Sequence, residues 1–220
     1  MDFGLFLELL LSIPKTLYFN LKHFPLKVAI KIPILINRRT KLANISGDII
    51  LPEKITFGLV KIGFSGSYAL GGGASYFENR GKIVIKGKAT FSRGIQLIVG
   101  SKGCLEIGSD FRCNANCIIN VGNQISFGND CLLSWNIMIL DGDGHKIYFI
   151  DDSSMKMKKK QISVGNHVWI CANSTILKGA TIADNSIVAA GTTVSKELSQ
   201  KNILITENNK IVKKNINWKD

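Results

Sequence analysis

The chain has 220 residues, 45% of them hydrophobic, and a formal net charge of +12. This length and composition exclude an intrinsically disordered chain and predict one folded domain with at most a small appendage. The charge favours anionic partners such as phosphates, acidic glycans or a membrane surface. Nucleic acid is disfavoured, because no recognition motif or row of aromatic residues accompanies the lysines.

Residues 1–41 are predicted to form a leader made of an amphipathic helix and an extended stretch. Apolar residues recur there at three- and four-residue spacing, which is typical of a helix with one apolar face: Phe3, Phe6, Leu7, Leu10 and Ile13. The segment lacks a basic signal-peptide region and reaches Pro14 too soon to span a bilayer. We expect the apolar face to pack on the domain or on a neighbouring subunit. Peripheral contact with a membrane is the alternative, because lysines follow the helix.

The strongest pattern lies after residue 161. Aliphatic β-branched residues are separated by six positions every time: Val164, Ile170, Ile176, Ile182, Val188 and Val194. A helix would repeat every 3.6 residues and an ordinary strand every two, so this spacing predicts a solenoid of short parallel strands. Three hexads form one coil, with the first residue of each in the core. The expected stacked pairs are Val164 with Ile182, Ile170 with Val188, and Ile176 with Val194.

The same spacing continues upstream with interruptions. Three earlier coils are predicted from the triplets Ile85, Phe91, Leu97; Ile107, Cys113, Ile119; and Phe127, Leu133, Ile139. Short corner insertions at "VGSKG" and "VGNQ" separate these coils, and a long insertion spans 141–161. Before residue 82 the pattern blurs, and "YALGGGASYFENRG" is interpreted as an irregular turn. A further coil is expected around Ile49, Ile55 and Ile62.

The five cysteines lie inside apolar repeats and are odd in number, which favours reduced, buried thiols in the cytosol. Cys113 and Cys117 form a C-x3-C pair. No second pair of ligands or nearby histidine completes a zinc set, so no metal site is expected.

The string "ISVGNHVWICANSTILKGATIADNSIVAAGTTVSK" (162–196) resembles the hexapeptide-repeat acyltransferases, which move acetyl groups from acetyl-CoA. The D-x-D-x-H pattern in the preceding loop resembles the sugar O-acetyltransferases of bacterial capsule and lipopolysaccharide pathways. The resemblance implies an all-β solenoid, a left-handed parallel β-helix over residues 42–200, with the leader before it and a short tail at 201–220. It also implies a homotrimer with coenzyme A in the clefts between subunits. Two departures are Cys171 and Ala183 at usual glycine positions, and "ENNKIVKK" (207–214) in place of "G-N-P-A-K".

Acetyl transfer to a sugar hydroxyl needs a base that removes the hydroxyl proton, and a neutral imidazole suits this task near pH 7. His145, within "ILDGDGHKIYF" (139–149), is predicted to be this base, since His23 lies in the leader and His167 at a turn position. Asp143 is predicted to orient or stabilise the imidazole. Asp141 either binds the acceptor or forms a turn.

The resemblance assigns Asn116 to the acceptor or acetyl group and Trp169 to the pantetheine arm. Trp135 and Asn136 precede the loop and are predicted to line the cleft. For coenzyme A, small corner residues would admit the pantetheine arm and lysines would bind the phosphates: Lys178, Gly179, Ala190, Gly191 and Lys196. Ordinary structural roles stay open for these residues, such as a corner asparagine, a packed tryptophan or a solvated lysine.

The predicted function is therefore direct acetyl transfer from acetyl-CoA to a hydroxyl of a bacterial surface-polysaccharide sugar or its precursor, with no acyl-enzyme. The acceptor is expected to be an anionic or lipid-linked glycan, and the location cytoplasmic or peripheral to the inner face of the membrane. A β-helical carbonic anhydrase is disfavoured, because it needs three histidines at one metal. A non-catalytic scaffold, and transfer to an amine or other small acceptor, are the alternatives.

Overall fold

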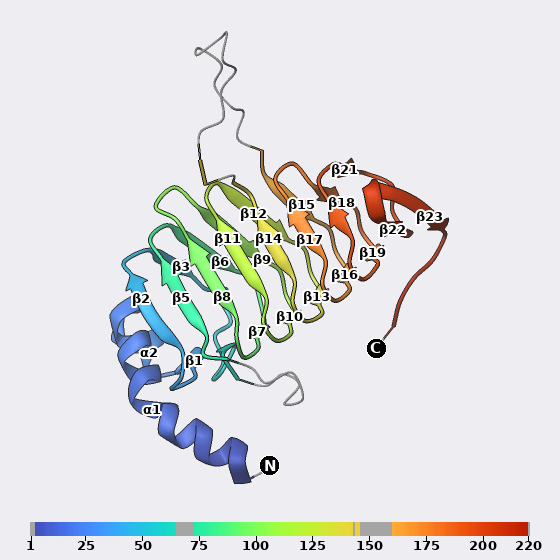
Figure 1. Ribbon diagram of the computed structural model, residues 1–220. Coiled ribbons are helices and arrows are strands. Elements are labelled where there is room, and N and C mark those ends of the chain that lie inside the picture. Colours follow the sequence, from blue (N-terminus) through green and yellow to red (C-terminus); the bar gives the residue numbers. More distant parts are fainter. Residues whose placement is uncertain (1–2, 65–72, 143, 146–159, 220) are drawn as a thin grey trace, which may run out of the picture.

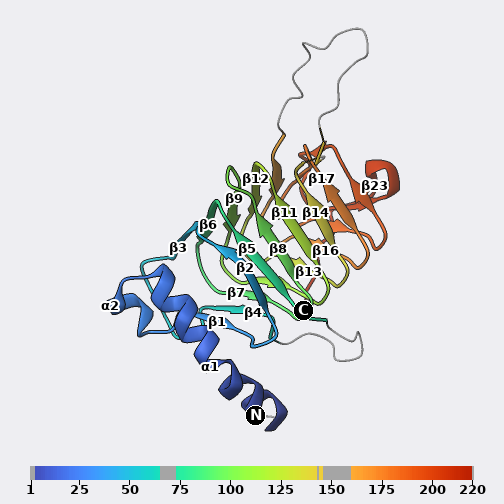
Figure 2. The same cartoon turned by 60° about the vertical axis from the view of Figure 1, so that its left-hand side comes forward.

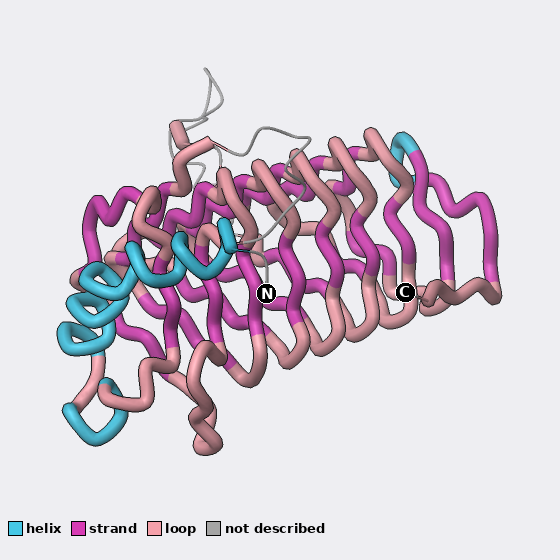
Figure 3. The backbone as a smooth tube through the Cα atoms, turned by 90° about the horizontal axis from the view of Figure 1, so that it is seen from below, coloured by secondary structure: helices cyan, strands magenta, loops and turns pink. Residues whose placement is uncertain are grey.

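The computed structural model describes residues 3–64, 73–142, 144–145 and 160–219. Parallel strands form a three-sided solenoid, and helices α1 (Phe3–His23) and α2 (Leu26–Ala29) lie at its N-terminal end (Figures 1 and 2). The chain visits three sheets, A, B and C, in the same order in successive coils, and the coils stack along one axis (Figure 3). Within the described ranges, no helix is long and apolar enough to cross a bilayer.

Each sheet is a stack of strands contributed by successive coils. Sheet A contains β1 (Ile34–Ile36), β4 (Val60–Ile62), β7 (Ala89–Phe91), β10 (Phe111–Cys113), β13 (Leu132–Leu133), β16 (Trp169–Ile170), β19 (Ile187–Val188), β22 (Ile203–Thr206) and β23 (Lys210–Lys214). Sheet B contains β2 (Lys41–Ile45), β5 (Tyr76–Asn79), β8 (Gln96–Val99), β11 (Ile118–Val121), β14 (Met138–Leu140), β17 (Thr175–Leu177) and β20 (Thr193–Val194). Sheet C contains β3 (Asp48–Ile50), β6 (Lys82–Ile85), β9 (Cys104–Ile107), β12 (Gln124–Phe127), β15 (Ile162–Val164), β18 (Thr181–Ile182) and β21 (Glu197–Leu198).

The predicted register is confirmed strand by strand. The expected pairs of the last coils are Val164 with Ile182, Ile170 with Val188, and Ile176 with Val194, and all three are present. The earlier triplets pair in the same way, in the columns Ile85–Ile107–Phe127, Phe91–Cys113–Leu133 and Leu97–Ile119–Ile139. All of these side chains are buried in one continuous core. The six-residue spacing therefore marks the inward positions of the three sheets.

The solenoid is longer at both ends than the predicted range 42–200. Strand β1 already pairs with β4, so the first coil begins inside the predicted leader. Strand β22 extends sheet A inside the predicted tail, and β23 pairs with it in the antiparallel direction. The six-residue spacing does not predict β22, because Val188 pairs with Ile205, which is 17 rather than 18 residues further on.

The region before residue 82 is also more regular than predicted. Ile49 and Ile62 lie in β3 and β4 as expected, whereas Ile55 lies outside any strand. Strand β5 occupies part of the segment interpreted as an irregular turn, and it pairs with β2 and β8. Residues 65–72 lie outside the described ranges.

Helix α1 covers the open edge of strand β1 with polar side chains. Ser12, Thr16 and Asn20 are four residues apart, so they share one side of the helix, and all three are buried. Asn20 accepts a hydrogen bond from the Ile34 N–H (3.2 Å) and donates one to the Ile34 carbonyl (2.7 Å). Thr16 does the same for Ile36 (3.0 and 3.2 Å), and Ser12 accepts one further backbone N–H (2.9 Å). These side chains satisfy backbone groups that an uncovered edge strand would leave unpaired.

Replacing Asn20 with alanine is expected to lower the free energy of unfolding by about 1–3 kcal/mol, because the buried N–H and C=O of Ile34 lose their partner. Chemical denaturation measures this change. Leu21→Ala, at an exposed position of the same helix, is the control and should change the free energy by less than about 0.5 kcal/mol. An equal loss in both variants would contradict the edge-capping role.

The predicted apolar side of α1 lines an open groove beside the solenoid and is not buried against it, which corrects the expectation that it packs on its own domain. Phe6, Leu10 and Ile13 are 49%, 51% and 45% exposed. The physical reason is that the end of a β-solenoid presents unpaired backbone groups as well as apolar area. Polar side chains are needed there, so the polar side of α1 is the one that packs inward.

Candidate active site

The corner insertions of successive coils lie at one edge of the solenoid. They follow β8, β11 and β14, all strands of sheet B, and each leads into a strand of sheet C. This B–C corner therefore carries the short insertions at 100–103 and 122–123, and the two described ends of the long insertion meet the solenoid here, after β14 and before β15 (Figure 1). The loop that bears the predicted base leaves the solenoid at this edge.

Asp141 fastens the start of the long insertion to the coil below. Its side chain is 4% exposed, and its two carboxylate oxygens accept hydrogen bonds from the N–H groups of Gly122 (2.6 Å) and Asn123 (2.8 Å). A carboxylate buried against two backbone donors stabilises a turn. Of the two roles considered for Asp141, the structure therefore supports the turn rather than contact with the acceptor.

His145 follows this anchor, and its side chain is exposed. Asp143 and residues 146–159 lie outside the described residues. The support of His145 by Asp143 therefore stays a prediction. An exposed histidine four residues after a buried anchor is accessible to a substrate at the B–C corner, which the proposed base requires.

The end of the insertion returns to the same corner, beside predicted coenzyme A residues. Gly179 has a left-handed backbone (φ 82°), and a Cβ at this position would lie 2.8 Å from the Lys160 side chain. The left-handed backbone favours glycine here, whereas the flexible Lys160 side chain could move aside. Lys178 precedes this glycine, and Lys196 lies in the B–C corner of the next coil. Three lysines therefore line the edge that carries the His145 loop.

The opposite edge of sheet B, the A–B corner, holds a stack of residues with left-handed backbone. Asn116, Asn136 and Asn173 have φ values of 61°, 57° and 59°, and Gly94 and Gly191 continue the stack at 74° and 73°. Asparagine and glycine are the residues that best tolerate this conformation. The Asn136 Nδ2 also donates a hydrogen bond to the Asn173 Oδ1 (3.1 Å). Asn116 and Asn136 thus have a clear structural role, whatever else they contact.

The other predicted site residues accompany this corner. Trp135 is 41% exposed and directly precedes the stack, and Ala190 is exposed beside Gly191. Trp169 lies in β16 of sheet A, where its Nε1 donates a hydrogen bond to the Ser134 Oγ (3.0 Å). Its side chain is only partly buried, in agreement with an outward position on the sheet.

Within one chain, the predicted residues therefore form two groups rather than one. Asn136 and Asp141 stand at the two ends of strand β14, five residues and roughly 16 Å apart at about 3.3 Å per residue. The residues at the A–B corner lie on one side of sheet B, and the His145 loop with its lysines lies on the other. The two groups therefore lie at opposite edges of sheet B within one chain.

The C-terminal segment contacts the solenoid through a cluster that the sequence reasoning missed. The Trp218 ring stacks on the His167 imidazole, with centroids 4.2 Å apart and an interplanar angle of 5°. Trp218 also lies near Trp169, with ring centroids 6.0 Å apart. Asp130 contacts the same histidine. The register offered a signal for part of this cluster: pairing of Leu133 with Ile170 also stacks the residues three positions earlier, Asp130 and His167.

His167 bridges two hydrogen-bond acceptors. Its Nδ1 lies 2.6 Å from the Asp130 Oδ2, and its Nε2 lies 3.1 Å from the Trp218 carbonyl oxygen. Both ring nitrogens can donate only when the imidazole is protonated. Burial lowers the pKa of His167, but the hydrogen bonds to Asp130 and to the Trp218 carbonyl outweigh burial and raise the pKa above its ordinary value.

The docking of the C-terminal segment is expected to weaken as the pH rises. Because the pKa of His167 is raised, its stabilising contribution is complete below the ordinary imidazole pKa of about 6.5 and is lost as the pH passes the raised value. Tryptophan emission recorded from about pH 5 to about pH 9 follows the release of Trp218. His167→Phe keeps an aromatic ring but cannot titrate. An identical transition in that variant would show that another group is responsible.

A three-sided solenoid of six-residue units with a long histidine-bearing insertion defines this protein as a left-handed parallel β-helix of hexapeptide repeats. Residues 162–196 match the family described as bacterial transferase hexapeptide (six repeats). The predicted resemblance to hexapeptide-repeat acyltransferases is confirmed by this match and by similarity to named acetyltransferases.

Curated relatives include sugar and polysaccharide O-acetyltransferases. The chain is 32% identical to the galactoside O-acetyltransferase of Escherichia coli K12 over 94 residues, which are 43% of this chain and 46% of that protein. It is 25% identical to the polysialic acid O-acetyltransferase of Escherichia coli O1:K1 / APEC, over 61% of this chain and 41% of that protein. The chain thus spans less than half the length of these two relatives.

Solved structures with the same fold include two polysialic acid enzymes. The polysialic acid-specific acetyltransferase NeuO superposes with a TM-score of 0.58 at 18% identity, over 86% of this chain and 79% of that one. The polysialic acid O-acetyltransferase OatWY gives a TM-score of 0.54 at 24% identity, over 82% and 91%. At these identities the similarity establishes the β-helical fold.

Proposed function

We propose that this protein is an O-acetyltransferase that moves an acetyl group from acetyl-CoA to a hydroxyl of a bacterial surface-polysaccharide sugar or its precursor. The observation that carries the proposal is the exposed His145 in the long insertion, held at the B–C corner by Asp141 beside Lys160, Lys178 and Lys196. The same corner thus offers a base for a hydroxyl and positive charge for phosphates.

In the proposed reaction, the acceptor oxygen attacks the carbonyl carbon of the thioester while the His145 imidazole takes the hydroxyl proton. The C–S bond breaks, the thiol of coenzyme A leaves with a proton, and the acetyl group stays on the sugar oxygen. Asp143 would stabilise the imidazolium that forms. Cys171 has no role as a nucleophile in this scheme, because burial raises the pKa of its thiol to about 11.

The acceptor class rests on the relatives. The galactoside and polysialic acid enzymes are named for sugar and polysaccharide acceptors, and a third relative, from Escherichia coli K12, is named as a putative lipopolysaccharide biosynthesis O-acetyl transferase. That third relative is 22% identical over 63% of this chain and 75% of its own length. The net charge of +12 suits an anionic or lipid-phosphate-linked glycan.

The site is proposed to form between subunits of a homotrimer. The A–B corner of one subunit, with Asn116, Trp135 and Asn136, would face the His145 loop of its neighbour. Trp169, Ala190 and Gly191 would contact the pantetheine arm, while Lys178, Gly179 and Lys196 would lie along coenzyme A. A cytoplasmic location suits this donor and suits the five free cysteines.

The function is tested by incubating the full chain with acetyl-CoA and a panel of sugars and measuring the release of free thiol. Thiol release that depends on a sugar hydroxyl, together with mass-spectrometric detection of the acetylated sugar, is the expected result. Release that requires an amine would move the reaction to N-acetylation. Failure to bind coenzyme A would favour a non-catalytic solenoid.

A further inference from the structure

Exposed apolar side chains are concentrated at the N-terminal end of the solenoid. Among the described residues, fifteen large hydrophobic side chains are exposed, and twelve of them lie between Phe6 and Phe57. The most exposed are Leu26 and Ile30 (both 67%) and Phe57 (69%). Such a concentration of exposed apolar side chains marks a region that contacts something other than water.

Helix α1 is fixed so that one apolar side, called here its outward side, borders an open groove and stays exposed to solvent. Its inward side carries Ser12, Thr16 and Asn20, which hydrogen-bond the edge of β1. The helix cannot turn its apolar residues inward without breaking these bonds. The ion pair between Glu8 and Arg93 holds the first half of the helix to the solenoid as well. The outward side therefore presents Phe6, Leu10, Leu17 and Leu21 as a stable feature of the fold.

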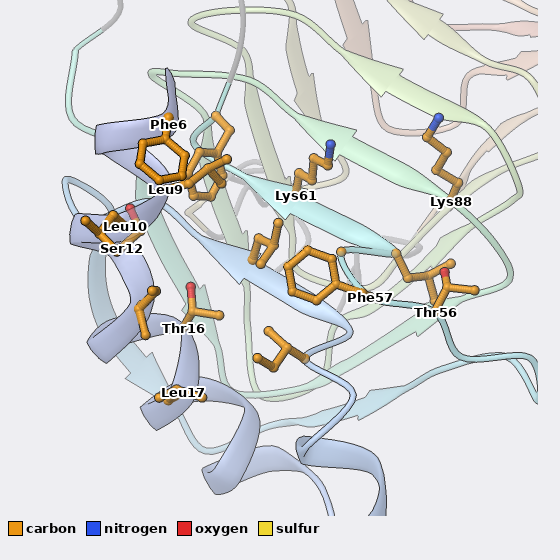
Figure 4. Close-up of a pocket in the computed structure, with 16 residues that line it drawn as sticks. Phe6, Leu9, Leu10, Ser12, Thr16, Leu17, Thr56, Phe57, Lys61 and Lys88 are labelled. Atoms are coloured by element: carbon orange, nitrogen blue, oxygen red, sulfur yellow. The ribbon is translucent and has the colours of Figure 1, made fainter. Parts of the chain in front are cut away.

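An apolar groove of about 720 Å³ runs between α1 and the first strands of sheet A (Figure 4). Phe6, Leu10 and Leu17 line it from the helix, and Phe57 lines it from the segment before β4. Lys61 and Lys88 also line the groove, each with its amino group beyond the apolar side chains (Figure 4). The groove thus combines an apolar floor with cationic groups.

The surroundings of this face are basic. Residues 3–64 contain nine lysines and arginines against three aspartates and glutamates, a net charge of +6 out of +12 for the chain. One of the three acidic residues, Glu8, is paired with Arg93. Lys22, Lys27 and Lys31 are exposed beside the apolar residues of α1 and α2. Two copies meeting through this face would bring like charges together, whereas an anionic surface would neutralise them.

We propose that the N-terminal face, defined as the outward side of α1 with α2, Phe57 and the adjoining groove, docks on the surface of an anionic phospholipid bilayer. The apolar side chains would enter the boundary between headgroups and acyl chains, and the lysines would contact the lipid phosphates. Apolar residues flanked by lysines are the combination by which interfacial helices bind such surfaces. This proposal is independent of acetyl transfer.

Vesicle flotation with the full chain tests the proposal. The protein is expected to float with vesicles of phosphatidylglycerol and phosphatidylcholine, not with phosphatidylcholine alone, and to bind less at high salt. Leu10→Ser with Leu17→Ser, and separately Lys22→Glu with Lys27→Glu, should each reduce the bound fraction at least about tenfold. Lys213→Glu with Lys214→Glu makes the same charge change at the other end of the solenoid and should bind like the wild type.

Three outcomes would overturn the proposal. The wild type could fail to float at low salt, the two N-terminal variants could bind as the wild type does, or the distant lysine variant could lose binding equally. Light scattering on the Leu10→Ser, Leu17→Ser variant tests the alternative that a second copy of the chain occupies this face. A smaller assembly together with unchanged vesicle binding would place a second copy on this face. Circular dichroism monitors folding, and the lysine variant provides the readout if the serine variant unfolds.

Discussion

The His145→Ala variant is expected to transfer acetyl groups to the sugar about 10²- to 10⁴-fold more slowly than the wild type. Without the imidazole, the attacking hydroxyl must lose its proton to water while the thioester is being attacked. The His145 side chain is exposed, so its removal should leave the fold intact. The rate of acceptor-dependent thiol release at saturating acetyl-CoA measures the effect.

Two controls separate loss of the base from loss of the site. Binding of coenzyme A to His145→Ala should be close to that of the wild type, because the proposed phosphate contacts are lysines. Added imidazole should partly restore the rate of the variant and leave the wild type unchanged, since a small base can occupy the space of the missing side chain. Equal acceptor-dependent rates in the variant and the wild type would rule out His145 as the base.

The repeating part of the fold could be predicted to the level of residue pairs. In a β-solenoid, each inward side chain packs on its equivalent in the next coil, so the core has the same period as the chain. Val164, for example, could be assigned to Ile182 from spacing alone. Ile205 could not be assigned to Val188, because one residue is missing from that coil and the period fails there.

The packing of α1 at the N-terminal end of the solenoid could not be predicted from the repeat. The amphipathic pattern of α1 was recognised, but the side that packs carries Thr16 and Asn20 together with the core residue Phe19. Hydrogen bonds from Thr16 and Asn20 to β1 outweigh the burial of Phe6 or Leu10, because unpaired backbone groups at a sheet edge are costly to bury. A row of small polar residues four apart on an otherwise apolar helix was the available signal.

The arrangement of the predicted site residues could not be read from the motifs alone. Motif and spacing identified the insertion and its histidine, while the two roles considered for Asp141 could not be separated until its carboxylate was placed on the amides of Gly122 and Asn123. The division of the residues between the two edges of sheet B follows from the coil geometry. It could be derived from the register, since Asn136 and Asp141 bracket one strand.

Because the predicted site residues lie at two edges of sheet B, assemblies that mix two inactive variants are expected to regain activity. His145→Ala and Asn116→Gly are each expected to be nearly inactive when pure. Glycine tolerates the left-handed backbone at position 116, so the corner should keep its shape. In assemblies refolded from an equal mixture, about one quarter of the sites should pair an intact A–B corner with an intact His145 loop. We therefore expect about one quarter of the wild-type rate.

The mixture distinguishes a site between subunits from a site within one chain, because a site within one chain could not regain activity on mixing. Every chain in the mixture carries one of the two defects, so activity can return only where neighbouring subunits each contribute their intact edge. The double variant, which carries His145→Ala and Asn116→Gly in the same chain, provides the inactive control. Recovery in the first mixture alone would place the reaction between subunits. No recovery, with native mass spectrometry showing mixed assemblies, would restrict the site to one chain. Full activity of pure Asn116→Gly would confine Asn116 to its role in the corner.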